Sequence, residues 1–506
     1  MNTAPAAVRE THSAVVLLWG DRAYKAKKPV DLGFLDFSTR QARLRACHEE
    51  VRLNRRLTPD VYLGVADVIG PDGELCDHLV VMRRMPDERR LSTLVEAEAD
   101  VSTVVRQIAR DVAAFHARAP TGVEIAQSGS PQALTGRWRS NIDGVRRHAT
   151  TSVAGDIDRV ERLALRYVDG RGTLLAERVR AGLVRDGHGD LLAGDVFCLD
   201  DGPRVLDCLE FDDRLRWMDV LDDVCCLAMD LERLGARAAA EQLLAAYEEF
   251  SGTSQPVSLR HHYVAYRALM RAKVAALRAA GTGDDPVHET AVAQTATLVR
   301  VALGHLEEGR VRLVVVGGPP ASGKSTIAGA VADRLGATLL TSDRVRKEVH
   351  GRDPCRHAPA ALDQGLYDEQ ATRRTYQELA ALAASLLRRG ENVVVDASFT
   401  RGWQRQLLSD VARDTSADLD ELRCSAPAST RQDRLRARRR DPAYLSDADA
   451  EVGAALAART EAWPTALVVD TGGRRVDAIS DAHSALDRSP DSDGQVSNAK
   501  STSVDA

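Results

Sequence analysis

The stretch that decides the fold is Val314-Val315-Val316-Gly317-Gly318-Pro319-Pro320-Ala321-Ser322-Gly323-Lys324-Ser325-Thr326. An apolar run precedes a glycine-rich loop of the pattern G-x-x-x-x-G-K-S, and a helical pattern follows it. In such a loop the backbone N–H groups bind phosphate oxygens, the lysine reaches the β- and γ-phosphates, and the serine hydroxyl binds Mg²⁺. The start of the helix near Ser322 adds the positive end of its dipole. Residues 318–326 are therefore predicted to bind ATP, with Lys324 catalytic and Ser325 a metal ligand.

Outward from this loop the pattern alternates between strand and helix, which predicts an α/β domain, a parallel sheet with helices on both faces, over residues 306–486. The expected strands are 311–316, 338–341, 392–396, 418–425 and 466–470. The expected helices are 324–335, 360–389, 402–413 and 429–439. The polar tail, 487–506, is predicted to be disordered.

The 305 residues before this domain need a fold of their own, because a chain of 506 residues is too long for one core. Strands are expected at 14–19, 22–27 and 78–84, with a helix over 38–57. Helical periodicity then dominates up to 307, interrupted by short strands near 196–199 and 204–208 and by a possible hinge at 281–286. This order predicts an α+β two-lobed, protein-kinase-like domain over residues 1–305.

Composition excludes several classes of protein. The net charge of -6 predicts no general affinity for nucleic acid or for anionic membranes. Eight cysteines without a C-x-x-C pair are typical of reduced thiols in a cytoplasmic protein. No run approaches 18 apolar residues, so no membrane insertion is expected. The oligomeric state does not follow from these features.

Two strand ends of the second domain carry acidic residues. Asp343 follows the strand 338–341, where it could accept a proton from an acceptor hydroxyl. Arg344 or Arg346 could hold an anionic group of that acceptor. The alternative is that Asp343 merely caps the next helix. Asp396 ends the strand 392–396 and is expected to bind Mg²⁺, or else to contact the acceptor.

An arginine-rich helix follows the fourth strand of this domain. Arg431, Arg434 and Arg438 share one helical face. A basic run is usually a solvated surface, but here it stands where a lid could close over the γ-phosphate. Arg434 and Arg438 are the catalytic candidates of this helix.

Taken together, the loop, Ser342–Lys347, Val395–Phe399 and the Arg434–Arg438 pair followed by Ser446–Ala448 resemble the P-loop kinases of the zeta toxin, polynucleotide 5′-kinase and gluconate kinase group. The resemblance covers about 310–475. It implies that Asp343 is the catalytic base and that Arg346 anchors the substrate.

The first domain carries a second set of acidic residues. His188-Gly189-Asp190 places a carboxylate on a short loop, and Asp207 ends a strand seventeen residues later. Such a pair can serve as a general base and as a ligand for the Mg²⁺ of a triphosphate. Asp190 is the predicted base and Asp207 the predicted metal ligand.

Lysines on the strand 22–27 complete this second site. Ala23-Tyr24-Lys25 has the A-x-K pattern of a strand whose lysine contacts the α- and β-phosphates, and Lys27 competes for the role from the same face. Glu50 is expected to orient this lysine, although a solvated helix glutamate is the alternative. Val80–Met82 resembles the strand that binds the adenine, with Met82 as the nucleotide-binding candidate.

As a whole, residues 10–300 resemble the aminoglycoside phosphotransferase-like branch of the kinase fold. Both halves together resemble the bifunctional aminoglycoside phosphotransferase/ATP-binding proteins. Asp195 stands where that branch has a Mg²⁺-binding asparagine, which adds negative charge at a metal ligand. The short distance from Asp207 to Asp219, without an A-P-E motif, argues against a protein kinase.

These features predict a phosphotransferase that uses ATP and Mg²⁺ at two sites and phosphorylates a hydroxyl of a small molecule, such as an aminoglycoside or a sugar-like compound. Three alternatives stay open. The first domain could be an ATP-binding regulator without turnover, the enzyme could act on nucleic-acid 5′ ends, or one domain could phosphorylate the other.

Overall fold

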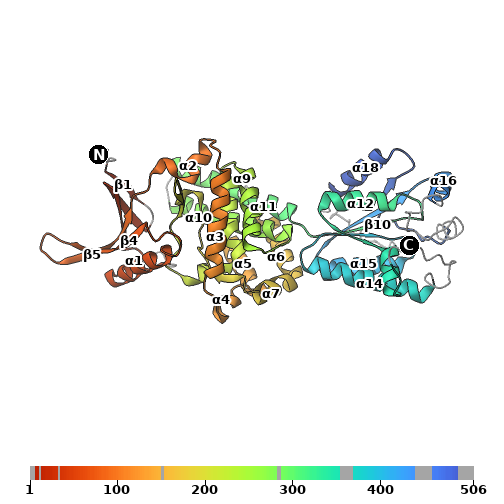
Figure 1. Ribbon diagram of the computed structural model, residues 1–506, viewed down its shortest axis with the longest axis horizontal. Helices are drawn as coiled ribbons and strands as arrows, with labels where there is room; N and C mark the ends of the chain where they lie inside the picture. Colours follow the sequence, from red (N-terminus) through yellow and green to blue (C-terminus); the bar gives the residue numbers. More distant parts are fainter. Residues whose placement is uncertain are drawn as a thin grey trace, which may run out of the picture. The chain divides into compact units, whose positions relative to one another are not determined.

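The computed structural model describes residues 6–10, 13–31, 35–149, 153–281, 286–353, 368–438 and 458–487. The chain divides into two compact units, Met1–Gly309 and Arg310–Ala506. Figure 1 shows both units along the chain. The predicted boundary at 305/306 lies in the last turn of the helix α11 (Pro286–Glu308), just before this division.

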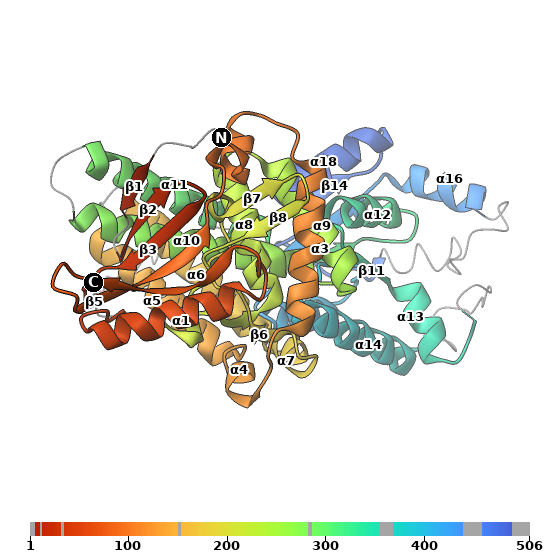
Figure 2. The same cartoon turned by 60° about the vertical axis from the view of Figure 1, so that its left-hand side comes forward.

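An antiparallel sheet of five strands begins the first unit. Its strand order is β1-β2-β3-β5-β4. The bounds are β1 Ala7–Glu10, β2 Ala14–Trp19, β3 Arg22–Lys27, β4 Tyr62–Ile69 and β5 Leu75–Arg83. The helix α1, Arg40–Asn54, packs on the sheet (Figure 2), with Cys47 and Val51 in a buried cluster with Ala23 and Val80. The sequence did not predict β1 and β4, because β1 is short and exposed and β4 is interrupted by Gly64 and Asp67.

A helical part follows the sheet. Its helices of eight residues or more are α3 Ser102–Arg118, α5 Pro131–His148, α6 Ala154–Gly170, α7 Gly172–Arg180, α8 Val220–Arg233, α9 Arg237–Ser251, α10 Val257–Gly281 and α11. Two short antiparallel ladders lie on this part: β6 (Val184–Asp186) with β9 (Trp217–Asp219), and β7 (Val196–Leu199) with β8 (Gly202–Val205). Most of the predicted hinge, residues 282–285, lies outside the described residues. This two-lobed α+β fold is the one that the sequence predicted.

A fully parallel five-stranded sheet forms the centre of the second unit, as predicted. The strand order is β11-β12-β10-β13-β14. The strands are β10 Arg312–Gly317, β11 Thr338–Thr341, β12 Val393–Asp396, β13 Asp418–Ser425 and β14 Leu467–Asp470. The helices are α12 Lys324–Leu335, α13 Ser342–Val349, α14 Glu369–Arg388, α15 Gly402–Asp414, α16 Ala428–Arg438 and α18 Arg475–Asp487.

Both faces of this sheet are covered by helices. The helices α12 and α18 lie on one face, and α14 and α15 lie on the other (Figure 1). Val314, Val316 and Leu422 are buried with Ile327 of α12, so the apolar strands and the helix form one core. The predicted segments 360–367 and 446–448 and the tail from 488 onward lie outside the described residues. No helix in the described ranges is long and apolar enough to cross a membrane.

Candidate active sites

In the first unit, two lysines of β3 meet one glutamate of α1. The Nζ of Lys25 lies 2.9 Å from Oε1 of Glu50, and the Nζ of Lys27 lies 2.5 Å from Oε2. Glu50 is fully buried. Burial alone would raise the pKa of Glu50, but the two ammonium groups outweigh burial and hold this pKa below its ordinary value. Glu50 is thus a buried partner of both lysines, and not a solvated helix residue.

The two lysines differ in their second partner. Lys25 also lies 2.7 Å from Oδ1 of Asp207, whereas Lys27 pairs with Glu210. Lys27 is almost fully buried, with a side chain that is 2% exposed against 15% for Lys25. Only Lys25 therefore links the strand to the predicted metal ligand. Glu210 was not predicted as a site residue, although it lies three positions after Asp207.

Asp207 has a left-handed backbone, with φ of 64°. Its N–H donates to the hydroxyl of Tyr62 over 3.2 Å, and the next N–H, of Cys208, donates to Oδ1 of Asn54 over 2.9 Å. These bonds hold the loop in a conformation that few non-glycine residues adopt. The positive charge of Lys25 holds the pKa of Asp207 below its ordinary value, so the carboxylate is ionised.

A buried carboxylate from α8 holds the loop that carries Asp190. Asp223 accepts the backbone N–H of His188 at 2.6 Å and of Gly189 at 3.0 Å. Its Oδ2 also lies 3.0 Å from Nε2 of His116. Burial would raise the pKa of Asp223, but the bond and charge of His116 outweigh it and lower the pKa. The loop is therefore fixed through its backbone, without using the side chain of Asp190.

The helix α10 contributes two arginines to the same loop. Arg267, fully buried, donates to the carbonyl of Gly189 over 2.7 Å and pairs with Asp222 at 2.6 Å. One turn later, Nη1 of Arg271 lies 3.1 Å from Oδ2 of Asp190. The sequence did not indicate either arginine, because they lie about 80 residues away from the loop.

The third aspartate of this site, Asp195, has a pKa far above the ordinary value of an aspartate. Burial, together with the charges of Asp207 and Asp190, raises the pKa of Asp195 to about 8. A divalent cation would offset this crowding of negative charge, so the donor set fits Mg²⁺. In the described parts of the chain, no three His, Cys, Asp or Glu side chains form a ready-made metal site. Magnesium needs only one or two carboxylates when substrate phosphates complete its shell.

Met82 lies inside β5, between Ala23 of β3 and Tyr62 of β4. Its side chain is buried in the core of the lobe. The N–H groups of the next two residues, Arg83 and Arg84, donate to other backbone carbonyls. Met82 thus packs in the lobe core, and the chain leaves the sheet only after it.

In the second unit the glycine-rich loop connects β10 to α12. Gly318 and Gly323 have φ of 139° and 89°, and Ala321 has φ of 62°. A Cβ at Gly318 would lie 2.6 Å from the carbonyl oxygen of Cys424. The loop therefore requires glycine for close backbone approach as well as for its dihedral angles.

Lys324 and Asp396 both act on the thiol of Cys424, at the carboxyl edge of the sheet. Asp396, 6% exposed, ends β12 and lies beside Val316 of β10. Burial raises the pKa of Cys424 on β13 to about 12, while Lys324 opposes the shift and Asp396 adds to it, which places both charges near this thiol. Ser325 is exposed at the start of α12. An ammonium, a carboxylate and a hydroxyl at one strand edge fit a nucleotide with its Mg²⁺.

Asp343 and Arg346 form an ion pair of 3.3 Å within α13. The cap of this helix is Thr341, so Asp343 is not the capping residue. The charges of Asp343 and Arg346 both act on the pKa of Tyr376 of α14, so Tyr376 lies near the pair. The hydroxyl of Tyr376 accepts the N–H of Phe399 over 3.2 Å. Asp343, Arg346 and Tyr376 thus gather beside the end of β12.

Arg434 of α16 reaches the glycine-rich loop. Its guanidinium donates to the carbonyl of Ala321 over 3.3 Å and to that of Thr471 over 2.6 Å. Thr471 in turn donates through Oγ1 to the carbonyl of Ser322 over 2.5 Å. Arg431 instead donates to the carbonyl of Ala426. The side chain of Arg438 lies outside the described part of the structure.

Comparisons with known proteins match each of the two units to a family. Residues 19–260 match the phosphotransferase enzyme family, and residues 313–463 match an AAA domain family. Uncharacterized proteins of Mycobacterium tuberculosis and Mycobacterium bovis are each 42% identical over 477 residues, which is 94% of this chain and 94% of theirs.

Among solved structures, a choline/ethanolamine kinase family protein from Mesorhizobium loti is 16% identical, with a TM-score of 0.35. The match covers 60% of this chain and 92% of the Mesorhizobium chain. A sugar kinase from Janibacter is 22% identical, with a TM-score of 0.28, and covers 36% of this chain and 97% of that chain. The chain belongs to the same family as the mycobacterial proteins, and it is a phosphotransferase with an aminoglycoside phosphotransferase-like kinase domain followed by a P-loop kinase domain.

Proposed function

We propose that both domains transfer the γ-phosphoryl group of ATP to a hydroxyl of a small molecule. The observation that supports this proposal is that each unit has a lysine and carboxylates at the place where the sequence predicted a phosphate site. In the first unit Lys25 lies 2.7 Å from Asp207. In the second unit Lys324, directly after the glycine-rich loop, and Asp396, at the end of β12, both act on the thiol of Cys424.

In the first unit, Asp190 accepts the proton of the acceptor hydroxyl. The hydroxyl oxygen forms a bond to the γ-phosphorus as the bond between that phosphorus and the bridging oxygen of ADP breaks. Lys25 binds the α- and β-phosphates, and Glu50 holds its ammonium in place. The fixed backbone of the His188–Asp190 loop keeps the base at one position, which favours an in-line attack.

In the second unit, Asp343 accepts the proton and Arg346 holds the acceptor. Lys324 binds the β- and γ-phosphates, and Arg434, already in contact with the loop, screens charge on the transferring group. Mg²⁺ would be held by Asp207 and Asp195 in the first unit and by Ser325 and Asp396 in the second, and would supply positive charge against the triphosphate.

The adenine of the first site is expected beyond the end of β5. Met82 lies between β3 and β4 within the sheet. We therefore expect the backbone groups that bind the adenine to lie in the segment that follows Arg84. The adenine is then bound at the end of β5, the strand that the sequence indicated, but by backbone groups after Arg84 in place of Met82.

One second candidate function has a specific observation in its favour. Burial and the charges of Asp207 and Asp190 raise the pKa of Asp195 to about 8, at a position where the resemblance to the aminoglycoside phosphotransferase-like kinases implies an uncharged asparagine. At neutral pH the Asp195 carboxyl therefore holds a proton that a metal ion must displace. If that proton prevents productive metal binding, the first unit senses ATP without turnover and only the second unit is a kinase.

The experiment incubates three full-length proteins with γ-labelled ATP, Mg²⁺, a fractionated small-molecule extract and aminoglycosides. The proteins are the wild type, Asp190→Asn and Lys324→Ala. We expect one labelled product to disappear with each variant. Products that disappear only with Lys324→Ala would make the first unit a sensor, and products that survive both variants would overturn both assignments.

A further inference from the structure

The end of α1 and the turn after it contact both loops that carry the proposed catalytic carboxylates of the first unit. The hydroxyl of Thr58 donates to the carbonyl of Val205 over 3.2 Å, and Asn54 accepts the N–H of Cys208. Val205 and Cys208 flank Asp207. Residues 54–58, called here the α1 turn, therefore hold the Asp207 loop from two sides.

Arg56 of the α1 turn holds the other loop. Its Nη1 donates to the carbonyl of Asp186 over 3.0 Å, and its Nη2 donates to that of Gly187 over 2.9 Å. These two residues directly precede His188. The ring of Phe115 lies 5.0 Å from the guanidinium carbon. The planar group is thus fixed on its face and along its edge, a geometry that lysine cannot reproduce.

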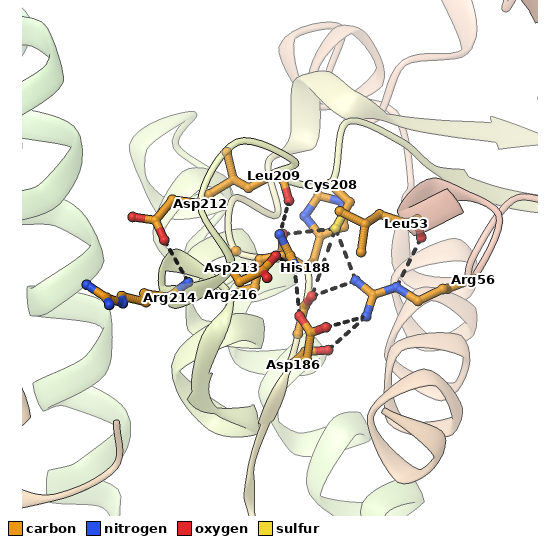
Figure 3. Close-up of polar contacts among 12 residues, drawn as sticks. Leu53, Arg56, Asp186, His188, Cys208, Leu209, Asp212, Asp213, Arg214 and Arg216 are labelled. Atoms are coloured by element: carbon orange, nitrogen blue, oxygen red, sulfur yellow. Dashed lines mark hydrogen bonds and ion pairs between the residues drawn. The ribbon is translucent and has the colours of Figure 1, made fainter. Parts of the chain in front are cut away.

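The carboxylate of Asp186 joins this contact to the Asp207 loop (Figure 3). Its Oδ2 lies 3.4 Å from Nη1 of Arg56, and its Oδ1 accepts Nε of Arg216 over 2.8 Å. Arg216, 1% exposed, also donates to the carbonyl of Leu209 over 2.7 Å. One buried carboxylate therefore bridges the α1 turn and the segment that follows Asp207.

The helix α1 also carries Glu50, which pairs with Lys25, the proposed phosphate-binding lysine of β3. Glu50 lies one turn before Asn54, and the side-chain amide of Asn54 donates to the carbonyl of Glu50 over 2.9 Å. We propose that Arg56 is a positioning residue for phosphoryl transfer: through Asp186 it sets the place of the Asp190 loop relative to Lys25 and Asp207. This inference rests on the proposed transfer by the first unit.

The chain offers a matched control for Arg56. The neighbouring Arg55 also donates to two backbone carbonyls, of Tyr62 at 2.8 Å and of Leu63 at 2.5 Å, but both belong to the β4 strand. Arg55→Gln therefore removes the same kind of bonds without a direct bond to either catalytic loop, since its connection to the Asp207 loop runs one step removed, through Tyr62. A purely structural role of Arg56 would give the two variants the same kinetic behaviour.

The test uses the full-length chain in the Lys324→Ala background, with Mg·ATP as the probe and water as acceptor. Phosphate release gives kcat and KM for ATP, and thermal melting gives stability. We expect Arg56→Gln to lower kcat by about ten- to a hundredfold with KM for ATP within threefold, because a misplaced base slows the chemical step. Arg55→Gln is expected to keep kcat within twofold.

Two further variants make every outcome decisive. Asp190→Asn in the same background must abolish the release; if it does not, the proposed function of the first unit fails and this inference fails with it. If Arg56→Gln does not fold, Arg56→Lys replaces it, since lysine retains the charge but not the fork of donors, and a loss of kcat of at least fivefold is expected. A kcat equal to that of Arg55→Gln, with Asp190→Asn inactive, would overturn the role of Arg56 alone.

Discussion

The ammonium of Lys25 lies 2.7 Å from the carboxylate of Asp207, although the two residues are 182 positions apart in the chain. Lys27, two residues later on the same strand, pairs with Glu210 of the same loop instead. This division separates two lysines that the sequence could not rank. It leads to the first prediction.

Lys25→Met is expected to reduce transfer by the first unit about a hundredfold, because a cation aimed at the phosphates is lost. Lys27→Met is expected to destabilise the unit by roughly 3 kcal/mol, since Glu210 remains buried without its cation. Thermal melting and labelled-phosphate transfer in the Lys324→Ala background separate the two effects. If Lys27→Met stopped transfer without lowering the melting temperature, Lys27 and not Lys25 would be the phosphate-binding residue.

Arg434 is predicted to support the nucleotide loop of the second unit. Arg434→Ala removes bonds to the carbonyls of Ala321 and Thr471. At about 1 kcal/mol for each bond, KM for ATP should rise by roughly ten- to thirtyfold, and kcat should fall as well because the proposed screening of the transferring group is lost. The measurement is steady-state turnover in the Asp190→Asn background. Arg431→Ala is the control, since the described side-chain bond of Arg431 goes to the carbonyl of Ala426 and not to the loop. An equal effect of both variants would contradict the prediction.

Gly318→Ala is predicted to abolish nucleotide binding by the second unit. Its φ of 139° disfavours any side chain, and the new Cβ would meet the Cys424 carbonyl at 2.6 Å. Gly329→Ala, inside α12 with nothing within 4 Å, should instead stabilise the domain by about 0.5–1 kcal/mol. Titration with a fluorescent ATP analogue and thermal melting test both. Unchanged binding by Gly318→Ala would show that the loop does not need its observed conformation.

A histidine pair between α10 and the end of α11 predicts pH-dependent stability. Nδ1 of His261 lies 2.9 Å from Nδ1 of His305, with Glu308, Glu232 and Arg237 around the pair. Burial, with the charge of His305, lowers the pKa of His261 to about 4. The unfolded chain binds a proton near the ordinary histidine pKa of about 6.5, so the stability present above that pH is lost as the pH falls toward 4.

The size of this effect follows from the shift. Between pH 7 and pH 5, protonation linked to His261 should lower the free energy of unfolding of the first unit by roughly 2 kcal/mol. His261→Gln cannot titrate and should lose correspondingly less stability over that range, as measured by urea denaturation at both pH values. His305 stays in both proteins, so the difference between their losses of stability is due to His261. Parallel losses in wild type and variant would contradict the prediction.

The sequence by itself determined the local parts of this protein. The glycine-rich loop, the strand β10 and the helix α12 follow from backbone requirements and apolar periodicity within one short segment, and the structure has α12 with the predicted bounds. The order of strands and helices likewise determined both fold classes. Asp190, Asp207, Lys25 and Glu50 were predicted as one site, and the structure brings Lys25, Glu50 and Asp207 into contact.

Only the tertiary structure decided which distant groups complete the sites. Glu210 is the partner of Lys27, Arg271 is the partner of Asp190, and Asp223 holds the backbone of the loop. None belongs to a local pattern, because an ion pair or a bond to a backbone N–H requires only that two side chains arrive at the same point. That arrival depends on how α8 and α10 pack beneath the loop, and packing is a property of the whole folded unit.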